Sequence, residues 1–223
     1  TIYFIANRPA HVNIQDILII SSAEEIHRYE NLLGDGKKFG VHLSYKVQPS
    51  PDGLAQAFIL GEDFIGDDAV ALVLGDNIFY GSGMGTLLKN KANPDGAVVF
   101  AYHVHDPERY GVVAFDTKNR IISLEEKPEQ PKSSFAVPGI YFYDNTVVQK
   151  AKNLRPSKRG ELEITDINKS YLAEQMLRLT PLEVGSAWLD TGTIESLMEA
   201  SQYVQALQSR QGVLVGSPEV AAY

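Results

Sequence analysis

At its centre the sequence reads Ala69-Val-Ala-Leu-Val-Leu74, followed directly by Gly75-Asp-Asn77. An unbroken apolar run of this length predicts a strand that is buried on both faces, as the strands of parallel sheets are. In an open α/β sheet, ligands bind just beyond the carboxyl ends of such strands. Asp76 therefore lies where a metal-bound phosphate could be held, and we take it as a candidate metal ligand.

A second aspartate follows another apolar segment, in Trp188-Leu-Asp-Thr-Gly-Thr193. Mg²⁺ is usually held by only one or two carboxylates together with substrate phosphates. Asp76 and Asp190, at the ends of two strands, therefore suit a metal-assisted reaction on a nucleotide. The alternative is that both are turn residues, since Asp-Asn and Asp-Thr-Gly are ordinary turn formers.

Strand-like and helix-like segments alternate along the rest of the chain. This rhythm predicts an α/β fold with a Rossmann-like, mostly parallel mixed sheet flanked by helices. We expect one domain over residues 1–223, with an antiparallel extension at 105–145 and a C-terminal helical part at 193–223. The predicted strands lie at 16–21, 41–47, 69–74, 97–104, 111–115, 121–124 and 139–142. The predicted helices lie at 23–33, 53–64, 84–90, 145–153, 164–173 and 194–209.

The composition limits the function. A chain of 223 residues can bury a core of its own, and its net charge of −8 gives no support to nucleic-acid binding. The absence of cysteine excludes a disulfide scaffold, thiolate metal sites and a cysteine nucleophile. No apolar run approaches the ~20 residues of a membrane-spanning helix. We therefore expect a cytoplasmic protein whose partners include neither nucleic acid nor membrane.

The loop Gln48-Pro-Ser-Pro-Asp-Gly53 connects a predicted strand to a predicted helix. Its prolines stiffen the turn, and Gly53 permits the backbone to approach a planar ligand closely. Free amides at the start of the helix favour an anion. Gln48 and Gly53 are therefore candidate ligand contacts, and a stiff connecting loop without a ligand is the alternative.

The segment Glu125-Glu-Lys-Pro128 follows a predicted strand. Its carboxylates can bind sugar hydroxyls and Lys127 can neutralise a phosphate, although most charged runs of this kind are solvated turns. Tyr110 begins another strand, where a rim or core aromatic is more common than a ligand contact.

Arg159 lies beside Gly160 and precedes a predicted helix. Its guanidinium could bind a phosphate through two parallel hydrogen bonds. The alternative is a structural role for the whole segment, since Glu161 and Glu163 suit the positive end of the following helix.

Two other patterns are weaker indications of a ligand-binding site. Gly81-Ser-Gly-Met-Gly85 lies between a strand and a helix, but Thr86 occupies the place of the last glycine of a dinucleotide loop. We interpret it as a turn, and a dehydrogenase as a remote alternative. His103 and His105 lie on one face of a strand, where a metal would need a third ligand.

Taken together, six motifs in a fixed order resemble the sugar-nucleotide pyrophosphorylase superfamily, and within it the glucose-1-phosphate thymidylyltransferases. The resemblance extends from about residue 14 to the C-terminus. The motifs are Gln48-Pro-Ser-Pro-Asp-Gly-Leu-Ala-Gln-Ala57, Leu74-Gly-Asp-Asn77, Tyr110-Gly-Val-Val113, Glu125-Glu-Lys-Pro128, Arg159-Gly-Glu-Leu-Glu-Ile-Thr-Asp166 and Trp188-Leu-Asp-Thr-Gly-Thr193.

The resemblance implies a reaction in which dTTP and glucose 1-phosphate give dTDP-glucose and pyrophosphate, the first step toward dTDP-rhamnose. It implies Mg²⁺ bound by Asp76 and Asp190, and contacts from Gln48 and Gly53 to the base. It also implies Arg159 on the sugar phosphate, and a homo-oligomer, either a dimer or a tetramer. The implied sugar-binding residues are Tyr110, Gly111, Glu126, Lys127, Val137 and Tyr141.

The chain departs from the family pattern at its N-terminal end. The family begins with a strand and the glycine-rich loop G-G-x-G-T-R-L, followed by a lysine, and this sequence contains neither. Residues 1–13 correspond only loosely to the helix after that lysine, and Arg8 is no substitute for the loop arginine. We therefore expect a chain truncated at the N-terminus and shortened at the C-terminus, lacking its first strand, and weakly active or inactive.

Two alternative functions remain open at this stage. One is a non-catalytic remnant that binds sugar phosphate or nucleotide. The other is a uridylyl-, cytidylyl- or adenylyltransferase with the same fold.

Overall fold

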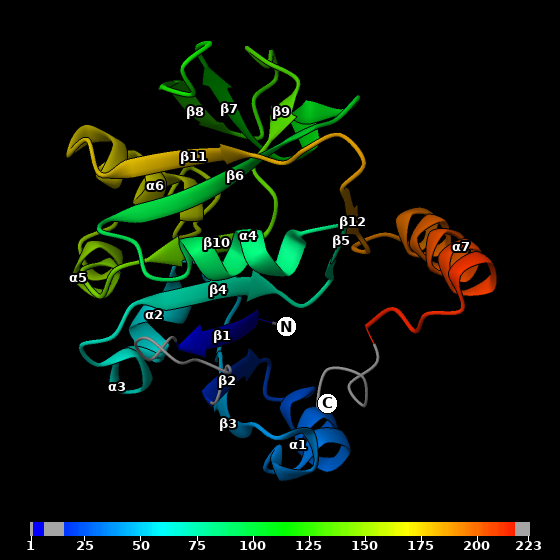
Figure 1. The fold of residues 1–223 in the computed structure, drawn as a ribbon. Coiled ribbons are helices and arrows are strands. Elements are labelled where there is room, and N and C mark those ends of the chain that lie inside the picture. The colour runs from blue at the N-terminus through cyan, green and yellow to red at the C-terminus, as the bar shows by residue number, and fades with distance from the viewer. Residues whose placement is uncertain (1, 7–15, 217–223) are drawn as a thin grey trace.

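The computed structural model describes residues 2–6 and 16–216 of the chain. Figure 1 shows a central sheet with helices packed around it, a smaller group of strands at the top, and α7 to one side. The described strands are β1 (Ile2–Ala6), β2 (Asp16–Ser21), β3 (His42–Val47), β4 (Val70–Leu74), β5 (Asn77–Tyr80), β6 (Ala97–His103), β7 (Gly111–Phe115), β8 (Ile121–Glu126), β9 (Phe135–Ala136), β10 (Ile140–Tyr143), β11 (Leu177–Pro181) and β12 (Ala187–Asp190). The described α-helices are α1 (Ile26–Leu33), α2 (Gln56–Leu60), α3 (Glu62–Ile65), α4 (Met84–Lys91), α5 (Val147–Lys152), α6 (Ile164–Ala173) and α7 (Ile194–Gln211).

The main sheet runs in the order β3-β2-β1-β4-β10-β6, and β11 pairs with β6. The predicted mixed sheet flanked by helices is confirmed, but its neighbouring strands are mostly antiparallel where the sequence predicts mostly parallel ones. β2, β3, β4, β6 and β11 do share one direction. β1 and β10 run in the opposite direction and separate them, so among the described strands only β2–β3 and β6–β11 are parallel neighbours.

β1 fills the centre of this sheet. It pairs antiparallel with both neighbours, so that Phe4 faces Leu18 of β2 and Leu72 of β4. The expected correspondence of residues 1–13 to a helix is wrong for this segment, because the apolar run Ile2-Tyr-Phe-Ile5 favours a strand. The sheet is therefore continuous where a missing strand is predicted. Residues 7–13, with Arg8, lie outside the described residues.

β4 is covered on both faces, as the sequence predicts. Val70 and Leu72 are fully buried in the larger core, together with residues of α2, α5 and α6. Ala71 packs on the opposite face beside Phe100 and Phe142, in the cluster that α4 also joins. Because successive side chains enter two different cores, the register of β4 is fixed. Asp76 therefore leaves the sheet at a defined edge.

The antiparallel strands predicted between residues 111 and 143 are present as β7, β8 and β10, and β9 is an addition that the sequence does not predict. β7 pairs with β8 from Gly111 opposite Glu126 to Phe115 opposite Ile121. β8 also contacts α6. This contact brings Glu126 next to the start of a helix that follows about 40 residues later in the chain.

Helix boundaries differ from the prediction mainly where a glycine intervenes. The single helix predicted over 53–64 is two short helices, α2 and α3, which meet at Gly61. α7 begins at Ile194 as predicted, because Thr193 Oγ1 accepts a hydrogen bond from Ser196 N and Ser196 Oγ accepts one from Thr193 N. None of the described helices is long and apolar enough to cross a membrane.

Candidate active site

A cavity of about 620 Å³ opens beside the carboxyl ends of β4, β8 and β12. It brings together nine of the eleven residues predicted for the site, and Gln48 and Gly53 are the two that do not line it. The nine are Asp76, Tyr110, Gly111, Glu126, Lys127, Val137, Tyr141, Arg159 and Asp190. Segments far apart in the sequence therefore meet at one edge of the fold.

The two predicted aspartates converge because the strands next to them pair. β5 lies antiparallel to β12 with Asn77 opposite Asp190, and both Thr191 N and Thr191 Oγ1 donate to the carbonyl oxygen of Asp76 at 2.8 Å. A Cβ atom added to Gly192 would lie 3.2 Å from Asp190 Oδ1 and 3.7 Å from Asp76 Oδ2. Glycine therefore leaves open a small space that both carboxylates face.

Asn77 fixes the orientation of the Asp76 carboxylate. Its Oδ1 accepts hydrogen bonds from Trp188 Nε1 at 2.6 Å and from Gly139 N at 3.0 Å. Because two N–H donors meet this oxygen, the amide nitrogen must point the other way, and it donates to Asp76 Oδ1 at 2.7 Å. Asp76 Oδ2 is then the oxygen near the open space at Gly192.

The charges around the cavity suit a divalent cation. Five carboxylates and three cationic side chains line it, so polyanionic substrates would meet a net negative wall. Two aspartates that face one open space, completed by substrate oxygens, are a donor set typical of Mg²⁺. The described residues contain no group of three His, Cys, Asp or Glu side chains suited to hold a metal without such substrate ligands. The five acids are Asp76, Glu126, Glu161, Glu163 and Asp190, and the three cations are Arg109, Lys127 and Arg159.

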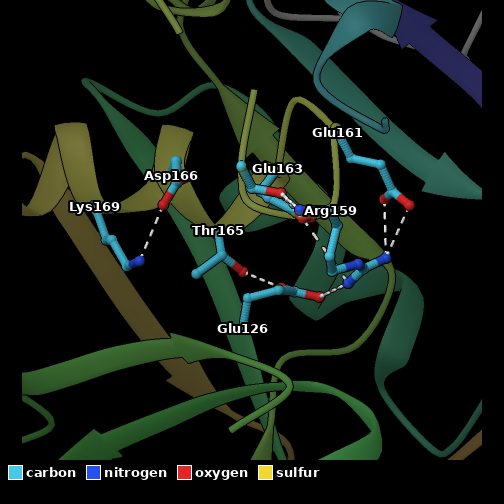
Figure 2. Close-up of polar contacts among 8 residues, drawn as sticks. Glu126, Arg159, Glu161, Glu163, Thr165, Asp166 and Lys169 are labelled. Carbon is cyan, nitrogen blue, oxygen red and sulfur yellow. Dashed lines mark hydrogen bonds and ion pairs between the residues drawn. The ribbon is translucent and has the colours of Figure 1, made fainter. Parts of the chain in front are cut away.

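Glu126 lies at the end of β8, largely buried in the cavity wall. Burial raises the pKa of its carboxyl above the usual value, whereas the hydrogen bond from Thr165 and the charges of Lys127 and Arg159 lower it. Thr165 Oγ1 donates to Glu126 Oε2 at 2.5 Å, and Glu126 Oε1 lies 3.8 Å from Arg159 Nη1 (Figure 2). The carboxylate is thus oriented by a neutral donor on one side and faces a cation on the other.

Aromatic side chains form the apolar part of the wall. Tyr110 meets Trp188 edge to face with ring centroids 5.0 Å apart, and the guanidinium of Arg109 lies over the Tyr110 ring, 5.4 Å from its centroid. Tyr141 is buried and stacks on Tyr143, and burial raises the pKa of its phenol far above the usual value. Tyr141 therefore stays a neutral hydroxyl at all physiological pH values.

Lys127 stands in an unusual backbone conformation. Its φ is +41°, in the left-handed region that residues other than glycine rarely occupy, and its N–H donates to the carbonyl oxygen of Tyr110 at 3.0 Å. Non-glycine residues held in this region cluster at functional sites. The conformation supports the interpretation of Lys127 as a site residue and not as part of a solvated turn.

Gly53 lies against another segment of the protein. Its φ is +104°, and an added Cβ would lie 2.5 Å from both N and O of Leu162. The close approach that glycine permits therefore includes the main chain of Leu162. Leu162 N donates to Asp52 O at 2.7 Å and Ala55 N donates to Leu162 O at 3.1 Å, which joins this loop to the Arg159 segment.

Gln48 is half-buried in the same loop. Its Nε2 donates to Gln56 Oε1 at 2.7 Å and to Gly53 O at 3.3 Å. These bonds hold the loop in shape, as expected for the stiff connection that is the alternative to a ligand contact.

Several cavity residues are absent from the sequence-based prediction: Asn77, Arg109, Glu161, Glu163, Thr165, Asn168, Trp188 and Thr193. Most of them lie inside the quoted motifs, so their closeness in sequence to a predicted site residue could have identified them. Arg109 lies just before such a motif, and nothing in the sequence marks it.

The other two patterns of the sequence lie outside this list of cavity residues. The glycines at 81–85 form a turn in which Met84 N donates to Gly81 O. The rings of His103 and His105 lie 6.0 Å apart.

Two converging carboxylates and a carboxylate–arginine cluster at the strand ends of an α/β sheet suit a nucleotidyltransferase. The chain belongs to the nucleotidyl transferase family, whose sequence profile matches residues 1–206. It is 50% identical to a glucose-1-phosphate thymidylyltransferase of Mycolicibacterium smegmatis over 222 residues, which are 100% of this chain and 77% of that relative. It is 55% identical to the enzyme of the same name from Neisseria meningitidis over 211 residues, which are 94% of this chain and 73% of that relative.

Solved structures show the same fold. A Bacillus anthracis protein described as a glucose-1-phosphate thymidylyltransferase, in complex with sucrose, has a TM-score of 0.79 and 42% identity over 92% of this chain and 80% of that one. A UDP-glucose pyrophosphorylase in complex with UDP-glucose has a TM-score of 0.71 but only 22% identity, covering 86% of this chain and 81% of that one. The second likeness supports the fold alone.

Proposed function

We propose that this chain acts as a glucose-1-phosphate thymidylyltransferase, which makes dTDP-glucose and pyrophosphate from dTTP and glucose 1-phosphate. The observation that supports it best is that Asp76, Asp190, Glu126 and Arg159 line one cavity together. A phosphate-binding arginine, sugar-binding carboxylates and a metal-compatible pair of aspartates are the parts that such a transfer requires. Half of the sequence is identical to that of curated relatives with this name.

In the proposed reaction a phosphate oxygen of glucose 1-phosphate attacks the α-phosphorus of dTTP. A new phosphorus–oxygen bond forms, the bond from the α-phosphorus to the bridging oxygen breaks, and pyrophosphate leaves with the electron pair. Catalysis of this kind consists mainly of positioning and charge neutralisation. Arg159 and Lys127 are the side chains of the cavity suited to orient the sugar phosphate.

Mg²⁺ is the cofactor that the cavity fits. Asp76 and Asp190 would hold it, and it would neutralise the negative charge of the phosphates. Asn77 would keep Asp76 Oδ2 directed toward the site, because the other carboxylate oxygen accepts the amide hydrogen bond.

The sugar would lie against the wall formed by Tyr110, Gly111, Glu126, Val137 and Tyr141. Glu126 can accept hydrogen bonds from sugar hydroxyls, and the aromatic rings offer a flat apolar surface. Gly111 suits this place because an added Cβ would lie 3.4 Å from Glu126 Oε2 and 3.3 Å from Thr165 Oγ1.

The proposed nucleotide contacts are Gln48 and Gly53, on the loop that Leu162 joins to the Arg159 segment. We place the reaction at the first step of dTDP-rhamnose synthesis, in the cytoplasm, and expect the active form to be a homo-oligomer.

The direct test is pyrophosphate release by the purified chain with dTTP, glucose 1-phosphate and Mg²⁺. Any release should depend on all three, and it should be little with UTP, CTP or ATP in place of dTTP. Binding of glucose 1-phosphate by calorimetry without any release would favour a non-catalytic binding protein. Equal release with UTP would contradict the thymidylyl assignment.

A further inference from the structure

The guanidinium of Arg159 is surrounded by three carboxylates (Figure 2). Its Nη2 lies 2.9 Å and 3.0 Å from the two oxygens of Glu161. Its Nη1 lies 3.8 Å from Glu126 Oε1 and 3.8 Å from Glu163 Oε1. Glu161 therefore makes the direct hydrogen bonds, and the other two carboxylates contribute at longer range.

The three carboxylates differ in how firmly they are held. Thr165 Oγ1 donates to Glu126, and Ser157 Oγ donates to Glu163 Oε1 at 2.8 Å, so both have a second partner. Glu163 is also buried. Among the described residues, the carboxylate of Glu161 contacts no side chain that donates to it except Arg159, and 35% of the side chain is exposed. Glu161 can therefore leave Arg159 without breaking any other side-chain hydrogen bond.

A phosphate needs the nitrogen that Glu161 occupies. Guanidinium groups bind phosphate through charge-assisted hydrogen bonds from both terminal nitrogens. In the described arrangement Nη1 lies 3.8 Å from the oxygens of Glu126 and Glu163, whereas Nη2 donates directly to Glu161, a carboxylate of the same charge as the incoming ligand. Binding of a sugar phosphate at Arg159 is thus an exchange of one anion for another.

We infer that Glu161 is an internal competitor of the substrate phosphate, whose carboxylate occupies Arg159 Nη2 until a phosphate group displaces it. The inference rests on the proposed function and adds to it a cost that phosphate binding must meet. A dianionic phosphate competes with the carboxylate for the guanidinium, whereas a neutral sugar has no group that can. Arg159 meanwhile stays oriented by a partner that is released on binding.

The test compares glucose 1-phosphate binding to the wild-type chain, Glu161→Gln and Glu161→Ala by calorimetry, at low ionic strength without metal. Exposed ion pairs are weak, so we expect both variants to bind glucose 1-phosphate about two- to fivefold more tightly. Neutral glucose should bind no better to the variants than to the wild type. Unchanged or weaker glucose 1-phosphate binding in both variants would overturn the inference.

Asp166→Asn is the matched control. Asp166 lies in the same view as Arg159, but its carboxylate pairs with Lys169 at 2.9 Å and does not line the cavity (Figure 2). This variant loses one negative charge nearby without touching Arg159, so its affinity for glucose 1-phosphate should stay that of the wild type. An equal gain in Asp166→Asn would mean that net charge alone explains the effect, and would overturn the inference.

Inorganic phosphate separates the inference from the proposed function. If glucose 1-phosphate binds to no form of the chain, the proposed function fails, and phosphate alone is titrated instead. Tighter phosphate binding by Glu161→Gln than by the wild type would still support the exchange at Arg159. Equal phosphate binding, or none by any form, would overturn it.

Discussion

The hydroxyl of Thr165, in the first turn of α6, donates a hydrogen bond to the carboxylate of Glu126 at the end of β8. The two residues are 39 positions apart in the sequence, and Thr165 is almost fully buried. The bond joins the hairpin of β7 and β8 to the helix that follows the Arg159 segment. It also stabilises the charged form of a carboxyl whose burial disfavours the charge.

We expect Thr165→Val to weaken glucose 1-phosphate binding by about tenfold, because a hydrogen bond to a charged group is removed. The pKa of Glu126 should rise further, since Thr165 lowers it in the wild type. The acid-side loss of binding should therefore begin at a higher pH. Calorimetric titrations across the pH range check both effects. Thr165→Ser keeps the hydroxyl and should behave as the wild type, and a loss in Thr165→Ser equal to that in Thr165→Val would contradict the explanation.

Glu126→Gln should separate stability from function. Burial raises the pKa of Glu126 above its usual 4.5, so this group favours folding below about pH 4.5, and that contribution is lost as the pH rises through the raised pKa. Glutamine keeps the shape without the charge. At pH 7 we expect the free energy of unfolding to rise by up to about 1 kcal/mol, while glucose 1-phosphate binding falls.

Urea unfolding at pH 7 and at pH 4 measures this difference. The advantage of Glu126→Gln should shrink at pH 4, where Glu126 itself becomes protonated. A variant less stable than the wild type at pH 7 would show that the charge of Glu126 stabilises the fold, against our expectation.

Gly192→Ala should remove activity with little effect on folding. The new methyl group would occupy the space that Asp76 and Asp190 face, 3.2 Å from Asp190 Oδ1. We expect at least about a tenfold loss in pyrophosphate release and weaker Mn²⁺ binding by electron paramagnetic resonance, since small displacements of reacting groups are costly. Gly85→Ala is the control, because nothing lies within 4 Å of its added Cβ on α4. Equal metal binding by Gly192→Ala and the wild type would contradict the prediction that the metal binds in the space beside Gly192.

Gly53→Ala should lower the free energy of unfolding by about 3 kcal/mol, because the residue has a positive φ and its new methyl group would overlap the main chain of Leu162. Gly40→Ala is the control, because Gly40 has a positive φ of +70° in the left-handed α region with nothing within 4 Å of its added Cβ. Its loss should therefore be only about 1 kcal/mol, the cost of the backbone conformation. Urea unfolding of the two variants isolates the contact with Leu162, and equal losses would show that this contact contributes nothing.

The sequence predicts those parts of the fold that depend on local pattern. β4 follows from its apolar run and the place of Asp76 from the end of that strand, and the helix predicted from residue 194 is present as α7. β1 and β10 could not be oriented in this way, because strand direction depends on partners distant in the chain. The run Ile2–Ile5 favours a strand in the sequence, but its place between β2 and β4 is a tertiary property.

For the site as well, the sequence predicts what depends on local pattern and not what depends on tertiary contacts. The sequence places Asp76, Asp190, Glu126 and Arg159 in motifs, but it does not predict that Asn77 orients Asp76, because Gly139 and Trp188 lie far from it in the chain. The sequence predicts that Gly53 permits a close approach to its backbone, but it does not predict the contact with Leu162. The neighbour that approaches Gly53 is another loop of the protein, which a pattern in one segment cannot identify.

The main-chain bonds between Leu162 and the loop of Gly53 join the two proposed ligand sites. Asp52 and Ala55 belong to the proposed nucleotide loop, and Leu162 to the segment that presents Arg159. A ligand that restricts the motion of one segment restricts the other as well, so the entropy of ordering both is lost with the first ligand. The second ligand then binds to a segment that is already ordered. By reciprocity, each substrate should raise the affinity for the other by the same factor, whichever binds first.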